Sequence, residues 1–466
     1  MTTLEAQAPD TGVARHSALL AVSAGLVGVV SYLCTLLMAH LLPAAQYTQY
    51  AAAQMLVGIV GIVAHALVPL PLAALVRRHL AGTDGRRDGM AFATLVSVAV
   101  GTVAGLATGG ITAAFAPWPV AVATGIGSLV LFAVAPAQGW LQGELRFTRY
   151  AVVSVLEVGA RLLFSVLAVA AGWGPAGALL GFAVGGLALV AGPLAMLREV
   201  TWRPAVLRER ARWSETGDIA LVQLVVSVLV GADVVLVALL GSGTSAEAGF
   251  QALATLAKGP VYVAAGTVLV AFPLLRASVQ SPDSGGVADV LRAALRSFTT
   301  LALTAAVVLA TVPTALVALI LPAAYVGSVR LLPALAVAGL GYGALTVLAT
   351  VLLALRLHGR TRLGLVAATV AIAGGLGVGW ALDGVTGLAV GAAVGAVIAT
   401  GALGVLAAPV LPSGTTGDLL RSGAVAAILL GVLLMAAPIP LLWLACAAAG
   451  GLLALRPDLV RRRAVR

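Results

Sequence analysis

About fourteen apolar runs follow one another along the chain, each roughly 18 to 26 residues long and separated from the next by a short polar segment. A helix needs about 20 apolar residues to cross the hydrocarbon layer of a bilayer, so these runs have the length of membrane spans. The short alternating strands of a membrane barrel are not visible, so helices are the expected spanning element. We predict spans at 17–39, 49–76, 90–114, 118–139, 150–171, 175–197, 218–240, 248–275, 297–321, 331–355, 363–382, 386–408, 420–436 and 438–455.

The basic residues lie almost entirely in every second gap between these spans. If the N-terminus is cytoplasmic, the cytoplasmic segments hold 24 of the 27 basic residues and the outer gaps hold only Arg330. This distribution follows the positive-inside rule, and a missed or invented span would reverse every later loop. We therefore predict a multi-pass protein of the bacterial inner membrane with both termini in the cytoplasm.

A weak internal repeat divides the predicted spans into two halves. Spans one and two align with spans seven and eight at an offset near 200 residues, which places Gly58 on Gly259. Two pseudo-symmetric six-helix lobes of the same orientation are a recurring transporter plan. The predicted all-α organisation is a cytoplasmic tail (1–16), an N-lobe (17–197), a cytoplasmic linker (198–217), a C-lobe (218–408), two additional C-terminal helices (409–455) and a basic cytoplasmic tail (456–466).

Composition agrees with a membrane protein and removes several other classes. Hydrophobic residues make up 61% of the chain and charged residues 9%, with a mean hydropathy of +1.09. The net charge of +10 is explained by the cytoplasmic arginines, so nucleic acid is not an expected partner. Cys34 and Cys446 both fall within apolar spans, and no phosphate-binding loop or zinc motif is visible. We expect no cofactor, no metal site and no catalytic residues.

Charged side chains inside a membrane are energetically costly, so each one is a functional hypothesis. Glu157 and Arg161 lie four residues apart on span five and can form a pair on one helix face, either as a structural pair or as cavity lining. His65 in span two could titrate near neutral pH or could simply be hydrogen-bonded.

Asp233 and Lys258, the only lysine, lie on spans seven and eight at similar predicted depths, so the two side chains could meet. They could form a static pair, or a cavity pair that binds an anionic substrate or couples to an ion. Gly259 and Pro260 follow Lys258 and favour a broken helix, which often marks a transporter site. The predicted hinge positions near the cytoplasmic ends of spans two and eight are Pro69, Pro71 and Pro273.

Three stretches in order are similar to Wzx-type polysaccharide flippases. Residues 141–185 contain a Gln-Gly-x-x-Arg-Phe turn, then Glu and Arg one helical turn apart, then Gly-x-Gly-x-x-Gly at the next span. Residues 231–278 resemble spans seven and eight of these flippases, with an aspartate (Asp233), an Ala-Gly-Phe sequence where the chain re-enters the membrane, Thr-x-x-Lys and a final Phe-Pro. Residues 321–362 resemble their spans nine and ten. The resemblance covers most of residues 17–410.

This resemblance implies a member of the multidrug/oligosaccharidyl-lipid/polysaccharide (MOP) exporter superfamily. Such proteins move undecaprenyl-pyrophosphate-linked oligosaccharide to the outer leaflet by alternating access. On that basis Asp233, Lys258, Glu157 and Arg161 are cavity candidates, with Lys258 and Arg161 facing the pyrophosphate. A proton or sodium ion could couple to the cycle. The arginine-rich cavity expected of a lipid II flippase is not evident in spans one and two.

Two other classes are weighed against a flippase. The first is a small-molecule exporter, either a multidrug antiporter of the same superfamily or a major facilitator. Residues 81–89 resemble the loop signature of the major facilitators. The second is an integral-membrane glycosyltransferase or polymerase, which would normally need a large outer loop. Every predicted outer loop is short, so an enzyme is not expected.

Overall fold

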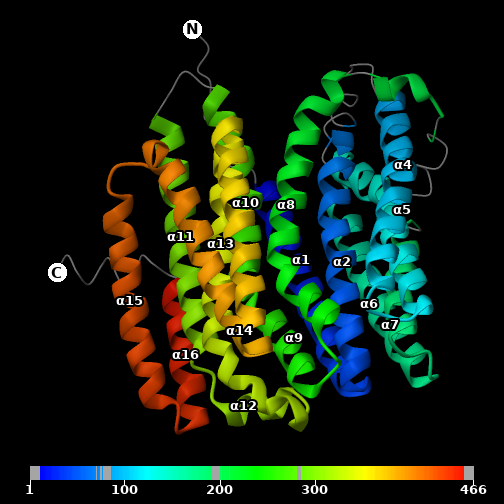
Figure 1. Ribbon diagram of the computed structural model, residues 1–466. Coiled ribbons are helices and arrows are strands. Elements are labelled where there is room, and N and C mark those ends of the chain that lie inside the picture. The colour runs from blue at the N-terminus through cyan, green and yellow to red at the C-terminus, as the bar shows by residue number, and fades with distance from the viewer. Residues whose placement is uncertain are drawn as a thin grey trace. The chain divides into compact units, whose positions relative to one another are not determined.

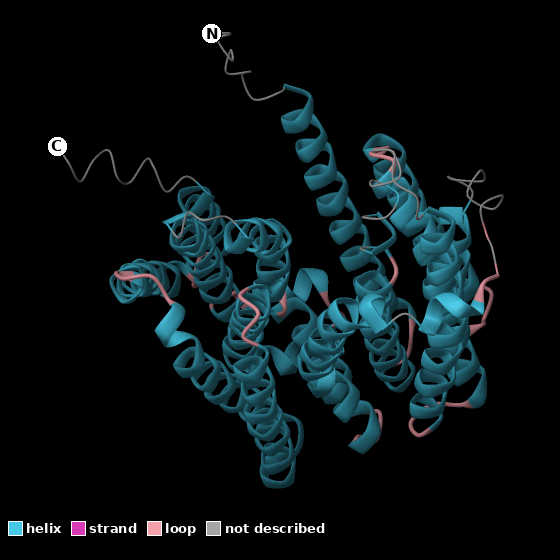
Figure 2. Ribbon diagram, turned by 90° about the horizontal axis from the view of Figure 1, so that it is seen from above, coloured by secondary structure: helices cyan, strands magenta, loops and turns pink. Residues whose placement is uncertain are grey.

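The computed structural model describes residues 11–455, with gaps at 70, 74–75, 77–85, 191–199, 201, 209 and 281–284. Within these ranges the chain consists of helices and connecting loops, and Figure 2 shows no strand among them. Ten helices are long and apolar enough to cross a membrane, three shorter apolar helices add to them, and the 53-residue segment His358–Val410 contains two helices separated by a kink. The structure confirms the predicted all-α membrane fold.

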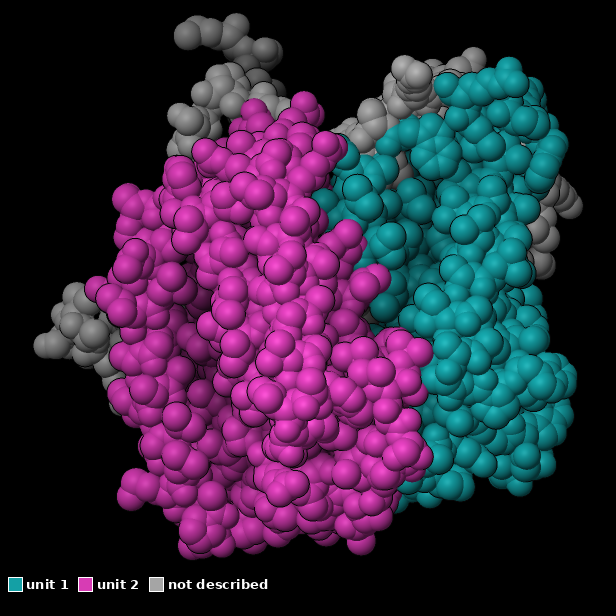
Figure 3. Space-filling model, in the orientation of Figure 1, with its two compact units in different colours: residues 1–224 teal, residues 225–466 magenta. Residues whose placement is uncertain are grey.

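The chain divides into two compact units, Met1–Leu224 and Val225–Arg466 (Figure 3). The boundary falls inside the helix Arg210–Leu240. Helices of the first unit are labelled in Figure 1. They are α1 (Thr11–Leu41), α2 (Ala44–Leu67), α4 (Arg86–Ala113), α5 (Trp118–Gly143), α6 (Phe147–Ala170), α7 (Gly174–Val190), the 3-10 helix η2 (Pro204–Arg208) and the first part of α8 (Arg210–Leu240).

The second unit begins with the remainder of α8. It continues with α9 (Ser245–Ala257), α10 (Gly259–Gln280), α11 (Gly285–Ala310), α12 (Thr314–Ile320), η3 (Ala323–Leu331), α13 (Leu332–Ala354), α14 (His358–Ala407), η4 (Ala408–Val410), α15 (Thr415–Ala436) and α16 (Pro440–Leu455).

Each unit has its own apolar core, and large apolar side chains also cover the outer helix faces. Phe132 and Trp140 are buried in the first unit, as are Leu291 and Phe298 in the second. By contrast, Met435 on α15 is 85% exposed. A soluble protein rarely leaves contiguous apolar surface of this kind in water, whereas lipid tails cover it without penalty.

The two units repeat the same helix-ending turn. Leu145 after α5 and Arg356 after α13 both adopt positive φ, at 57° and 58°. In each turn the next backbone N–H reaches five residues back, from Arg146 to the Leu141 carbonyl at 3.0 Å and from Leu357 to the Leu352 carbonyl at 2.9 Å. This is the Schellman ending of a helix, normally occupied by glycine at the positive-φ position.

The predicted span at 297–321 differs most from the structure in where its helix begins. The span predicted at 297–321 is a helix that starts earlier, at Gly285, and ends at Ala310, and it is followed by the separate short helix α12. Pro313 disfavours helical backbone at the preceding residue and cannot donate a helical hydrogen bond, which accounts for the ending. The early start was missed because the first turns of α11 are amphipathic, with Asp289 exposed and Leu291 buried.

The segment predicted as a linker is partly packed against the first unit. The Arg203 guanidinium lies 3.1 Å from the Asp88 carboxylate, and the Trp213 ring packs edge-on against Phe92. The Trp213 indole N–H also donates to the Leu207 carbonyl at 2.8 Å. These contacts fix η2 and the start of α8 on α4.

The turn between α8 and α9 is closed by a buried glutamate. The Glu247 carboxylate accepts hydrogen bonds from the backbone N–H groups of Ser242, Gly243 and Thr244 at 3.1, 2.6 and 3.0 Å. The Thr244 hydroxyl accepts from the Glu247 N–H in return, which completes a capping box. The turn therefore holds the start of α9 in place.

Replacement of Glu247 by alanine is expected to cost about 2 kcal/mol of stability, because backbone donors at this turn lose a charged acceptor. The measurement is the midpoint of thermal unfolding of the purified protein in detergent, which should fall by several degrees. Asp289→Ala is the matched control, since it removes an exposed carboxylate whose surface ion pair contributes little. Equal midpoints for the two variants would contradict this role of Glu247.

Candidate functional site

The second unit contains a buried ion pair between α8 and the end of α9. The Lys258 ammonium lies 3.2 Å from one carboxylate oxygen of Asp233, and the two side chains are 7% and 2% exposed. The same oxygen accepts a hydrogen bond from the Val234 N–H at 2.8 Å. The structure thus brings together the two residues that the sequence placed at similar depth, whereas their role in binding stays a prediction.

Lys258 lies at an interruption between two helices. Helix α9 ends at Ala257 and α10 begins at Gly259, with Lys258 as the residue between them. Pro260 has no N–H to continue the α9 hydrogen-bond ladder, which accounts for the break. Lys258 directly follows the carbonyl end of α9, where a basic residue is favoured.

Two glycines of α13 allow this interruption to be packed closely. A Cβ atom at Gly339 would overlap the Ala257 carbonyl, and one at Gly343 would lie 2.8 Å from the Pro260 carbonyl oxygen. Larger residues at either position would push α13 away from the broken helix. The backbone around Lys258 is therefore held from the side by α13 as well as by its own turn.

Two further polar groups lie around this pair, and neither could be predicted from the sequence. Gln251 on α9 is fully buried and donates to the Val234 carbonyl at 3.0 Å, but its own amide oxygen has no hydrogen-bond partner among the described residues. The Tyr342 hydroxyl on α13 is likewise buried without a described partner, and Tyr342 is close enough to Asp233 to interact electrostatically. The Gln251 amide oxygen and the Tyr342 hydroxyl can therefore still form hydrogen bonds next to the pair.

The first unit contains a second, less buried pair on α6. The Arg161 guanidinium lies 3.7 Å from the Glu157 carboxylate, with side chains 12% and 14% exposed. It also donates to the Ser31 hydroxyl on α1 and stacks 4.6 Å from the ring centre of Phe182 on α7. Arg161 is therefore positioned by three helices. Its contacts with Ser31 and Phe182 could not be read from the sequence, which showed only the spacing to Glu157.

The glycine ridge of α7 makes room for this pair. A Cβ atom at Gly185 would lie 2.6 Å from the Glu157 carbonyl oxygen, and one at Gly181 would lie 2.8 Å from that of Arg161. Small residues at this spacing let two membrane helices approach closely. Helix α7 consequently supports α6 at the two charged residues.

Polar side chains of α1 and α2 extend the same region. Gln54 donates to the Thr35 hydroxyl at 3.2 Å, and the Cys34 thiol lies 3.9 Å from the Tyr50 hydroxyl. Cys34 also interacts electrostatically with Arg161. Hydroxyl and amide groups of this kind suit recognition of a polar, hydrogen-bonding ligand.

The remaining predicted residues lie outside these two pairs. His65 lies near the end of α2, close to the Gln138 side chain of α5, and its role stays a prediction. Pro69 and Pro71 follow the end of α2, and Pro273 lies inside α10. Their roles as hinges stay predictions. In the described part of the chain, no three His, Cys, Asp or Glu side chains gather where they could hold a metal ion.

No protein-family model matches the sequence, and no curated protein does. Among solved structures, the lipid II flippase MurJ in its inward closed conformation aligns over 96% of this chain and 100% of its own, with a TM-score of 0.71 and 13% identity. An inward-facing multidrug resistance MATE family transporter of the MOP superfamily aligns over 85% of this chain and 95% of its own, with a TM-score of 0.60 and 12% identity.

The chain has the fold of the MOP transporters. A MOP superfamily transporter from Pyrococcus furiosus also aligns, over 89% of this chain and 95% of its own, with a TM-score of 0.56 and 13% identity. The likeness to these transporters is thus one of fold, at 12–13% identity.

Proposed function

We propose that this protein is a flippase that moves undecaprenyl-pyrophosphate-linked oligosaccharide from the cytoplasmic to the outer leaflet of the bacterial inner membrane. It would act by alternating access, without covalent chemistry, and would serve the export of a surface polysaccharide. The observation that carries this proposal is the ion pair of Lys258 and Asp233, buried at a helix break in a chain with a transporter fold. The match to the lipid II flippase supports a lipid-linked substrate.

The buried pair provides a simple means of binding and releasing an anion. A pyrophosphate competes with the Asp233 carboxylate for the Lys258 ammonium, so the cation is neutralised in both the empty and the loaded state. Because an unpaired charge inside the membrane is costly, the displaced Asp233 carboxylate would take up a proton when the anion binds. Within the first unit, Arg161 and its neighbouring hydroxyl and amide groups form a separate candidate contact for a phosphate or for sugar hydroxyls.

A second candidate function is export of small cationic drugs in exchange for a proton or sodium ion. The MATE matches favour it, since they share the same fold at similar coverage. In that case a carboxylate, either Asp233 of the second unit or Glu157 of the first, rather than a cation, would contact the substrate. The major-facilitator alternative is not retained, because the fold is that of the MOP transporters.

Reconstitution distinguishes the two candidates. Vesicles containing the protein are loaded with a fluorescent polyprenyl-pyrophosphate oligosaccharide, and its exposure to a membrane-impermeant quencher is followed over time. We expect protein-dependent translocation of this lipid and no exchange of a fluorescent cationic drug against an imposed proton or sodium gradient. Drug exchange without lipid translocation would establish the second candidate instead.

A further inference from the structure

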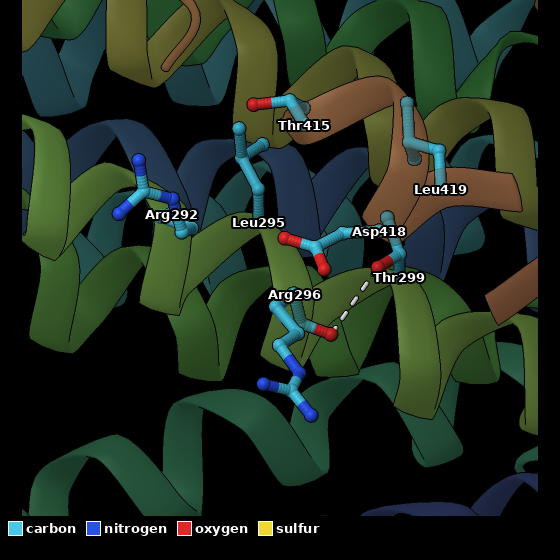
Figure 4. Close-up of a pocket in the computed structure, with 7 residues that line it drawn as sticks. All are labelled: Arg292, Leu295, Arg296, Thr299, Thr415, Asp418 and Leu419. Atoms are coloured by element: carbon cyan, nitrogen blue, oxygen red, sulfur yellow. Dashed lines mark hydrogen bonds between the residues drawn. The ribbon is translucent and has the colours of Figure 1, made fainter. Parts of the chain in front are cut away.

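An open recess lies between the first turns of α15 and the third and fourth turns of α11. The space that it encloses is only about 10 Å³, so it is a shallow surface groove over which a ligand would lie rather than a closed pocket. In Figure 4 the Asp418 carboxylate points toward α11, and the guanidinium groups of Arg292 and Arg296 extend on one side of it. The lining residues are Arg292, Leu295, Arg296, Thr299, Thr415, Asp418 and Leu419.

Charges of both signs face this recess and are only partly neutralised. The Arg292 guanidinium contacts the exposed Asp289 carboxylate at 3.2 Å and donates to the Ser413 carbonyl at 3.3 Å, and its side chain is still 41% exposed. Neither Arg296 nor Asp418 takes part in an ion pair with any described residue. The recess therefore offers two cationic groups and one carboxylate to a ligand.

The apolar surroundings of the recess match the edge of a bilayer. Leu419 is 44% exposed and Leu420 is 70% exposed, so the first turns of α15 present apolar surface beside the charges. Along both helices the charged residues gather at this end, and the remaining turns are apolar. Basic groups between helices at the cytoplasmic side of a membrane are typical contacts of lipid headgroups.

We propose that this recess binds the headgroup of an aminophospholipid of the phosphatidylethanolamine type. The phosphate contacts Arg292 and Arg296, the primary ammonium donates to the Asp418 carboxylate, and the acyl chains lie over Leu419 and Leu420. A purely anionic headgroup would face the carboxylate unfavourably. A choline headgroup has no N–H to donate to Asp418, so it loses that hydrogen bond.

The test measures lipid binding to the purified full-length protein in detergent. Dissociation constants for short-chain phosphatidylethanolamine, phosphatidylcholine and phosphatidylglycerol are obtained from titrations of the thermal-unfolding midpoint. We expect the ethanolamine lipid to bind about tenfold more tightly than the choline lipid, the difference made by one charge-assisted hydrogen bond. Equal binding of these two lipids by the wild-type protein, or tighter binding of phosphatidylglycerol, would overturn the proposal.

Variants then assign the contacts. Asp418→Asn is expected to remove the preference for ethanolamine over choline, and Arg292→Gln with Arg296→Gln is expected to weaken all three lipids about tenfold or more. Arg421→Gln is the matched control, because Arg421 is an exposed arginine of the same helix that does not line the recess. An Asp418→Asn protein that keeps the preference would contradict the assignment of the ammonium to Asp418.

Discussion

Substitution of Lys258 by methionine is expected to lower transport in reconstituted vesicles by about 100-fold or more, because the substrate anion loses its buried cationic partner. Methionine keeps most of the side-chain length and removes the charge. The same change leaves the Asp233 carboxylate buried without its cation, which is expected to cost about 3 to 5 kcal/mol of stability. Both the initial rate of lipid translocation and the unfolding midpoint are measured on the same preparation.

The control for this variant removes a cation that lies outside the helical core. Arg330 on η3 is exposed, and it is the only basic residue of the predicted outer loops. Arg330→Met should therefore leave the translocation rate within about twofold of wild type, since exposed charges contribute little to buried contacts. If both variants transport at the wild-type rate, Lys258 has no part in binding.

A second large effect is expected at the glycine contact inside α14. Asp383 and Gly384 have non-helical backbone angles, and the two halves of α14 fold back on each other there. A Cβ atom at Gly391 would overlap the backbone carbonyl of Gly375. Gly391→Ala is therefore expected to force the halves apart and cost about 3 kcal/mol. The yield of monodisperse protein and its unfolding midpoint should both fall.

Gly377 provides a matched control on the same helix. A Cβ atom there would meet no heavy atom within 4 Å. Gly377→Ala should keep or raise the unfolding midpoint, because alanine is a better helix former than glycine by up to about 1 kcal/mol. Opposite shifts at the two positions would show that backbone contact, and not loss of glycine as such, determines stability. A Gly391→Ala protein as stable as wild type would refute the close contact.

The positions of the helices could be predicted because membrane insertion imposes a strong and local rule. Runs of about 20 apolar residues and the placement of arginines depend on the chain alone, so most predicted spans coincide with observed helices. The break at Lys258 was also predictable, since Pro260 removes a helical hydrogen bond and the adjacent Gly259 is a weak helix former. The start of α11 was not, because its first turns carry charges on one face and are buried on the other.

The candidate site was only partly visible in the sequence. The pairing of Glu157 with Arg161 follows from helical spacing, and that of Asp233 with Lys258 from similar depth on adjacent helices. The contact of Arg161 with Ser31 joins residues 130 positions apart, and Tyr342 lies near Asp233 from α13. Such contacts depend on how distant helices pack, and no local pattern reports them. The lipid II flippase match also gives structural support to a fold first suggested by short motifs.

The most direct measurement of the central claim is the translocation rate of the Asp233→Asn, Lys258→Met double variant, compared with its unfolding midpoint. Removing both charges leaves neither one buried alone, so stability should return toward the wild-type value. If the pair serves transport, translocation of the polyprenyl-pyrophosphate oligosaccharide stays lost although the protein is folded. A double variant that regains both its stability and the wild-type transport rate would show that the pair is structural and would contradict the account.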